Sequence, residues 1–361
     1  MARLDEIFDL QMGKTPSRSN ADYWTDGQYD WVSIADLGTY QKYVEDTKEK
    51  ISASAVKESG IKSVPANTVI MSFKLSLGKT AITQEPVYTN EAIMAFVPTG
   101  KYTVLPDYFY YLFSAKDWTK GTNRAVMGTT LNKATLGAVS VTVPPLNEQR
   151  KIVMVLDKVS DLLAKRHQQL DKLDELVKSN FIEMFGDPVT NSKGLVTRKG
   201  SEFFTLTNGK FVPEEKRRDE GIPAYGGNGI SWYTDEILVT HDTIVVGRVG
   251  FQSGNVHFVT GPLWVTDNAM YISDFNKDQY DLRFLCALME HIDFTRFQDA
   301  GDLKKITQKP FMQMSFIAPS IQQQKSFITF VEQVDKSKLA IQKSLEKLEI
   351  LKKALMQEYF G

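Results

Sequence analysis

The chain has 361 residues, enough for two or three domains, and its 42% hydrophobic and 24% charged residues are ordinary for a soluble globular protein. Its longest apolar runs are far shorter than the ~18 residues that span a bilayer, and its single cysteine excludes an internal disulfide. The net charge of −1 neither supports nor excludes nucleic-acid binding, since such a binder must gather its basic residues on one surface.

Residues 1–143 contain short runs of β-type residues separated by turn residues. Residues 69–73 and 92–97 predict buried strands, and the alternation at 139–143 predicts a half-exposed one. Residues 3–10 predict a helix or a strand before a turn at 13–17. The aromatic-rich residues 107–115 predict a helix packed on the sheet. We therefore expect a first globular α+β region here.

A segment of 43 residues occurs twice, at 144–186 and at 319–361, without a gap. Each copy predicts a long helix whose apolar residues are alternately three and four positions apart, the spacing of a coiled coil. At two positions where this spacing calls for an apolar residue, the chain has the basic residues Arg166 and Lys338. We call the twelve apolar positions the seam: Leu156, Val159, Leu163, Leu170, Leu173, Val177, Val331, Val334, Ile341, Leu345, Leu348 and Leu355. The alternative is an amphipathic helix docked on a globular core.

A second globular region, residues 187–318, separates the two copies, after a turn-rich linker at 186–194. Residues 202–210 parallel residues 6–14, and elsewhere the two regions share little sequence. The predicted fold is α+β, with domains at 1–143 and 187–318 and helical spacers at 144–186 and 319–361. Because the second globule must return the chain to the start of the first helix, we expect the two helices to form one antiparallel coiled coil.

No catalytic constellation is visible in the sequence. Its four histidines are scattered without ligand spacing, its lone cysteine excludes a thiolate zinc site, and no phosphate-binding loop is present. Cys286 lies in an apolar run typical of a packed helix face. These features argue against a self-contained enzyme and predict no metal site. A small nuclease or methyltransferase acting alone, and a coiled-coil adaptor whose globules bind protein, stay open as alternatives.

Polar turns suit contacts with DNA phosphates and base edges, although each can also be an ordinary surface turn. Four of the chain's five tryptophans, Trp24, Trp31, Trp232 and Trp264, are instead predicted to pack within the fold. The candidate DNA-binding residues of the first globule are Lys14, Thr15, Ser17, Arg18, Lys74, Lys79, Arg124 and Lys133. Those of the second are Lys210, Arg217, Arg218, Asn228, Arg248, Lys304 and Lys305.

Several of these turns resemble a known family, the DNA specificity subunits of type I restriction–modification systems. Residues 13–17 (GKTPS), 22–24 (DYW) and 31–37 (WVSIADL) are similar to the opening of its target-recognition domain. Another variety of that domain is resembled by residues 225–230 (YGGNGI), 247–250 (GRVG), 254–255 (GN) and 264–268 (WVTDN). The family's conserved spacer is resembled by residues 144–149 (PPLNEQ) and, in degraded form, 319–324 (PSIQQQ).

This resemblance implies a cytoplasmic prokaryotic subunit without chemistry of its own, whose two globules each read one half of an asymmetric bipartite DNA site. It implies that the paired helices fix the distance between the half-sites and dock two methyltransferase subunits. Those partners bind S-adenosylmethionine and methylate adenine, and two ATP- and Mg-dependent restriction and translocase subunits complete the complex. The chain itself is expected to bind double-stranded DNA, no cofactor and no membrane.

Overall fold

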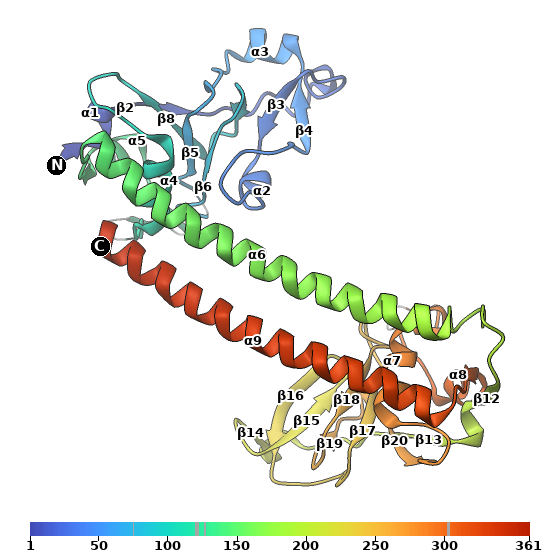
Figure 1. Cartoon of the computed structure of the whole chain (residues 1–361). Helices are drawn as coiled ribbons and strands as arrows, with labels where there is room; N and C mark the ends of the chain where they lie inside the picture. The colour runs from blue at the N-terminus through green and yellow to red at the C-terminus, as the bar shows by residue number, and fades with distance from the viewer. Residues whose placement is uncertain (75, 120–122, 126–127, 302–303) are drawn as a thin grey trace. The chain divides into compact units, whose positions relative to one another are not determined.

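The structure, a computed structural model, describes residues 1–361 except 75, 120–122, 126–127 and 302–303, and only the backbone of 123–125 and 128–130. The chain divides into two compact units, the first Met1–Arg166 with Ser344–Gly361, the second His167–Lys343. Each unit combines one globular region with parts of two long helices (Figure 1). The mixture of sheets and helices confirms the α+β class. Among the described residues no helix is long and apolar enough to cross a membrane.

The first globule is built on an antiparallel sheet in the order β2-β8-β5-β6 and a smaller one in the order β4-β3-β7, in which β3 and β7 are parallel. Its strands are β1 (Ala2–Arg3), β2 (Phe8–Met12), β3 (Tyr29–Val32), β4 (Glu49–Ile51), β5 (Val69–Ser72), β6 (Thr80–Ile82), β7 (Tyr88–Thr89), β8 (Ile93–Pro98), β9 (Asn123–Ala125), β10 (Gly128–Thr130) and β11 (Ser140–Val141). Its helices are α1 (Leu4–Ile7), η1 (Ala21–Tyr23), α2 (Ile34–Leu37), α3 (Ala53–Ser59), α4 (Pro106–Ala115) and α5 (Lys133–Gly137).

The apolar runs of the sequence become the centre of this globule. The strands predicted at 69–73 and 92–97 are confirmed as β5 and β8, and the helix predicted at 107–115 is α4. Phe109 and Phe113 of α4 are fully buried against Phe8 and Phe96 of the sheet. The strand predicted at 139–143 is shorter, because its partner β1 offers only two residues to pair with.

The second globule repeats this plan with a different sequence. Its sheets run β13-β20-β17-β18 and β14-β16-β15-β19, with β15 parallel to β19. Its strands are β12 (Thr197–Lys199), β13 (Phe204–Asn208), β14 (Arg217–Arg218), β15 (Ile222–Gly226), β16 (Gly229–Thr234), β17 (Thr243–Gly247), β18 (Val256–Val259), β19 (Trp264–Val265), β20 (Ala269–Phe275) and β21 (Ser315–Ile317). Its helices are η2 (Gly200–Glu202), η3 (Glu214–Lys216), α7 (Leu282–Glu290), η4 (Phe294–Phe297) and α8 (Gln308–Gln313).

The parallel between residues 6–14 and 202–210 marks a true structural equivalence. β2 and β13 both stand at the edge of a four-stranded sheet, and their five residues alternate between buried and exposed in the same order. In each globule this edge strand pairs with the last long strand, β8 or β20, and a two-residue strand, β7 or β19, pairs in parallel with a strand of the smaller sheet. Two little-related sequences therefore adopt closely similar topologies, which differ in that the second sheet has three strands in the first globule and four in the second.

The duplicated segments form α6 (Leu146–Phe185) and α9 (Ile321–Phe360), each of 40 residues (Figure 1). In the second unit, Lys338 of α9 binds Asp174 of α6 at 2.5 Å, and Phe327 packs on Phe181 with ring centroids 5.4 Å apart. Residues farther along α6 thus contact residues nearer the start of α9, so the two helix segments in this unit are antiparallel.

In the first unit the end of α9 meets the start of α6. The end of α9, from Leu355 to Phe360, packs on the core that contains Ile152 and Leu156 from the start of α6. All twelve seam side chains are buried or half-buried, whereas some apolar residues outside the seam, such as Leu339 and Ile350, are exposed. Within the seam the half-buried Lys338 is stabilised by its ion pairs with Asp174 and Asp335.

A buried glutamine fastens the start of each long helix to its own globule. The Gln149 side chain accepts a hydrogen bond from the Leu105 backbone N–H and donates to the carbonyls of Thr103 and Pro144, at 2.8–2.9 Å. Gln324 makes the same three bonds in the second unit, to the Asp281 N–H and to the carbonyls of Gln279 and Pro319. Both glutamines are 0% exposed, and they are one of the identities in the repeat.

Charges also join α6 to the first globule. Lys42 lies 2.8 Å from Asp107 of α4 and 2.5 Å from Asp157 of α6, and the Tyr111 hydroxyl donates to Asp157. Burial opposes ionisation of Lys42, but its hydrogen bonds to the two carboxylates prevail and raise its pKa. Burial likewise opposes ionisation of Asp107, yet Lys42 and Tyr43 lower its pKa below the ordinary value. Lys42 and Asp107 are therefore both ionised at neutral pH.

Candidate nucleic-acid interface

The first candidate lysine of each globule follows a glycine that docks against backbone. Lys14 donates its backbone N–H to the Thr89 carbonyl at 2.8 Å, and Lys210 donates to Val265 at 2.9 Å. A Cβ on Gly13 would lie 2.2 Å from the Thr89 oxygen, and one on Gly209 would lie 2.1 Å from a carbonyl oxygen of residue 266. Only glycine fits there, so both lysines begin a loop that is held close to the smaller sheet, with exposed side chains.

A tryptophan secures each of these lysine turns. The indole N–H of Trp31 donates to the Lys14 carbonyl at 3.1 Å, and that of Trp264 donates to the Lys210 carbonyl at 2.9 Å. Trp31 comes from β3 and Trp264 from β19, so different strands supply the same bond. Both are buried, which confirms the prediction that these two tryptophans pack within the fold.

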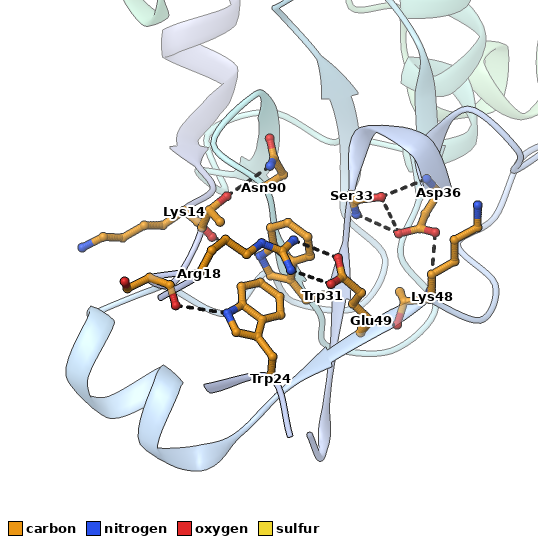
Figure 2. Close-up of polar contacts among 12 residues, drawn as sticks. Lys14, Arg18, Trp24, Trp31, Ser33, Asp36, Lys48, Glu49 and Asn90 are labelled. Atoms are coloured by element: carbon orange, nitrogen blue, oxygen red, sulfur yellow. Dashed lines mark hydrogen bonds and ion pairs between the residues drawn. The ribbon is translucent and has the colours of Figure 1, made fainter. Parts of the chain in front are cut away.

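Arg18 is held by a carboxylate and an aromatic ring (Figure 2). Its guanidinium forms two hydrogen bonds to the Glu49 carboxylate, at 2.5 and 2.8 Å, and lies 3.6 Å from the ring centroid of Trp24. The hydrogen bonds to Glu49 raise the pKa of Arg18, and they lower the pKa of Glu49. A DNA phosphate would compete with Glu49 for the same donors, so Arg18 offers DNA less charge than a free arginine.

Hydroxyl groups of the same loop are also engaged. Thr15 donates to Glu91 and accepts from the Asn90 amide, and the Ser17 hydroxyl pairs with that of Ser19. These bonds order the loop. Any contact of Thr15 or Ser17 with DNA would have to share or replace them.

Asp36 lies in the run at 31–37 that resembles the family, and its side chain stabilises the local fold. It is 2% exposed and accepts hydrogen bonds from the backbone N–H and the hydroxyl of Ser33, at 3.0 and 2.7 Å (Figure 2). Together they form a capping box at the start of α2, a role that the Ser-x-x-Asp spacing alone indicates. The backbone N–H of Lys48 also points to Asp36, at 3.4 Å.

The other predicted cations of the first globule are dispersed. Lys79 is exposed after a turn and Lys133 is exposed in the first turn of α5, whereas Lys74 is half-buried with its ammonium 5.2 Å from the Phe73 ring. Arg124 belongs to β9, and its side chain lies outside what the structure describes.

In the second globule, backbone pairing assembles cations that are far apart in sequence. The segment 304–306 pairs with 248–250: Gly250 donates to the Lys304 carbonyl at 2.8 Å, and Ile306 donates to the Arg248 carbonyl at 2.9 Å. This pairing places Arg248, Lys304 and Lys305 together. The Arg248 guanidinium donates to the Asp267 carbonyl at 3.1 Å, which fixes its direction.

The remaining candidates of this globule surround β14 and the β15–β16 turn. Arg217 is exposed, with its guanidinium 5.2 Å from the Trp232 ring, and Arg218 is paired with Asp235 at 3.0 Å. Asn228 is exposed at the turn. Trp24 and Trp232 are half-buried, and each packs against a small apolar cluster, as predicted, with an arginine over its ring.

A cavity of about 590 Å³ lies beside Arg217 and Asn228. Turns at 226–228, 249–252 and 266–268 line it, together with the side chains of Phe211 and Trp232. Among these residues only Arg217 and Asn228 were selected from the sequence. Several of the others lie in the runs 225–230, 247–250 and 264–268, which the resemblance includes without assigning roles, whereas Phe211 and Phe251 lie outside those runs. Within the described residues, no group of three His, Cys, Asp or Glu side chains is placed to hold a metal ion.

Comparison with known proteins matches residues 1–175 and 192–352 to the family model for the type I restriction modification DNA specificity domain. The EcoprrI specificity subunit of Escherichia coli is 23% identical over 356 residues, which cover 92% of this chain and 86% of that protein. The MjaIX specificity subunit of Methanocaldococcus jannaschii is 29% identical over 189 residues, 51% of this chain and 43% of that protein.

Two solved structures share the fold. The S subunit of a type I restriction–modification system from M. genitalium superposes with a TM-score of 0.61 at 16% identity, over 99% of this chain and 95% of that one. A chain from a structural study of complex assembly and conformational transition of the type I R-M system gives 0.64 at 14% identity, over 99% and 96%. Since the family model matches most of its length, the chain belongs to the type I restriction–modification DNA specificity subunits.

Proposed function

We propose that this chain reads an asymmetric, bipartite DNA site, with one half-site contacted by each globule. The observation that supports this most is that two globules of similar fold carry different loops. Closely similar topologies present Lys14 and Lys210 on equivalent turns, while the surrounding loops differ in length, aromatic content and charge. Two globules with similar folds and different loops are suited to reading two different base sequences.

The proposal assigns the chemistry to partners. Two methyltransferase subunits, which bind S-adenosylmethionine, would dock on the helices, and two restriction subunits would use ATP and Mg. In this proposal α6 and α9 form one antiparallel coiled coil along their full length and act as the spacer between the readers. Support comes from the antiparallel order of contacts in the second unit and from the packing of the end of α9 on the start of α6 in the first.

The proposal predicts a clear result for purified complexes of this chain with its methyltransferase subunits. Methylation sequencing of a host that expresses the complex should reveal one non-palindromic site with two specified halves. Binding to that duplex should weaken steeply as salt rises, because phosphate contacts release counterions. A complex that methylates without sequence preference, or a chain that turns over DNA alone, would contradict it.

Arg248→Ala should lower affinity for the preferred site by about 1–3 kcal/mol and relax one position of the second half-site, as expected for a base-reading arginine. Its fixed direction and its two lysine neighbours motivate this choice. Fluorescence anisotropy with a panel of single-base variants measures both effects. Arg198→Ala, on the exposed strand β12, is the matched control. If Arg248→Ala kept both affinity and preference, its assignment would be wrong.

A further inference from the structure

The 590 Å³ cavity of the second globule has a composition that points to one ligand. Two aromatic side chains at its rim are exposed to water: Phe251 is 97% exposed and Phe211 is 64% exposed. Phenylalanines left so open beside a hollow are typical of a surface that a partner covers.

The polar groups around the cavity have spare hydrogen-bonding capacity. Among the described residues, the Thr266 hydroxyl is buried and has no hydrogen-bond partner. The amides of Asn228 and Asn268 are exposed, and neither forms a side-chain hydrogen bond within the part of the chain that the structure describes. A buried hydroxyl without a partner is costly, and a ligand that hydrogen-bonds to it would remove that cost.

Glycine keeps the cavity open. A Cβ on Gly226 would lie 2.7 Å from the Ser231 hydroxyl and 3.7 Å from the Thr266 hydroxyl, so a side chain there would enter the space beside both. Gly227 lies so near the Gly247 backbone that its own Cβ would be 3.1 Å from the Gly247 Cα. The turns are thus packed backbone to backbone, and side chains are kept out of the middle.

We propose that this cavity is a base-reading pocket that takes an A·T pair of the second half-site, an inference that rests on the proposed function. Amide side chains match adenine, because they accept from N6 and donate to N7 at once, and aromatic rings match the thymine methyl group. Asn268 contacts the adenine edge, with Asn228 and the Thr266 hydroxyl beside it. Phe251 covers the thymine methyl group. Arg217 and Arg248 flank the pocket and hold the adjoining phosphates or bases.

Asn268→Ala tests the adenine contact in the complex with the methyltransferase subunits. Affinity for the preferred duplex should fall about 5- to 100-fold, the range of one good bidentate base contact. Discrimination at one A·T pair should disappear while the other positions keep theirs. The matched control is Asn276→Ala, an exposed asparagine of the same globule outside the pocket. Replacement of that adenine by 7-deazaadenine should weaken the unaltered chain and leave Asn268→Ala unchanged.

The thymine contact has a test that leaves the protein intact. Uracil in place of thymine removes one methyl group, so affinity should fall about fourfold at one position of the second half-site. Phe251→Ala should bind the thymine and uracil duplexes equally, with unchanged thermal unfolding, because the ring is exposed.

Two outcomes would overturn the pocket while leaving the proposed function standing. One is equal binding of thymine and uracil duplexes by the unaltered chain at every position of the half-site. The other is uniform weakening by Asn268→Ala across all sequences, which is the behaviour of a phosphate contact. Absence of any sequence preference in the unaltered complex would instead refute the proposed function itself.

Discussion

Gln149→Leu should lower the free energy of unfolding by about 3–5 kcal/mol. Leucine has nearly the volume of glutamine, so little packing is lost. The substitution leaves the Leu105 N–H and the carbonyls of Thr103 and Pro144 without their partner, next to a residue that is 0% exposed. Each buried polar group left unpaired costs about 1–3 kcal/mol, and three groups lose their partner. Water that reaches them in part reduces this cost, so we expect a total near the lower end of the summed cost.

The repeat supplies the companion experiment. Gln324→Leu should cost a similar amount, because its three bonds have equivalent partners in the second unit. Gln322→Leu, at an exposed position two residues before Gln324 on α9, should change stability by less than about 0.5 kcal/mol. Urea unfolding of the full chain, followed separately by probes in the two units, measures these values. A cost below about 1 kcal/mol for both buried glutamines would contradict the role given to them.

The glutamines also show how far a sequence can predict a structure. Their repetition at a constant offset is visible in the chain, and so is the helix that each begins. Their partners are not visible, because Leu105 and Asp281 lie 44 and 43 residues earlier and are reached only when α4 and α7 have packed. Periodicity predicts an element and its buried face, whereas the bonds that join elements depend on long-range packing.

The two globules illustrate the same limit for sheets. Only the edge strands β2 and β13, with the Gly-Lys turn after each, are alike enough in sequence to be matched. The other strands are two to seven residues long and separated by loops of unequal length, so their common order is set by tertiary pairing. The seam positions, by contrast, follow from local spacing alone, and all of them lie on the buried side of α6 and α9.

For the DNA contacts, the sequence shows which residue types are present, whereas only the structure shows which residues lie next to them. Arg18 was selected as a free cation, but Glu49, 31 residues away, occupies its guanidinium. Arg248 and Lys305 were selected separately and are brought together by a β-bridge from Val249 to Lys305. Apolar residues at the pocket, such as Phe251, could not be selected by charge, because their significance is their exposure.

The spacer role of the helices predicts a change in the DNA site when they are lengthened. Four residues would be inserted in α6 between Lys172 and Leu173, and four in α9 between Leu339 and Ala340, near the Asp174–Lys338 ion pair. Such an insertion is one helical turn of about 6 Å, and a coiled coil absorbs it by local unwinding. Since B-DNA rises about 3.4 Å per base pair, the gap between the half-sites should grow by one or two base pairs.

The identity of both half-sites should survive the insertion, because no residue of either globule is altered. Methylation sequencing of hosts that express the original and the lengthened chain reads the spacer and the half-sites in one experiment. A matched control replaces four exposed residues of α6 outside the seam, Gln168, Asp171, Lys172 and Glu175, by alanine without changing the length, and it should keep the original spacer. If the lengthened chain changed the bases of a half-site and kept the spacer, the loops would set the distance and the helices would not. If the alanine control also moved the spacer, the change would come from the altered helix surface and not from the length, because this control keeps the original helix length.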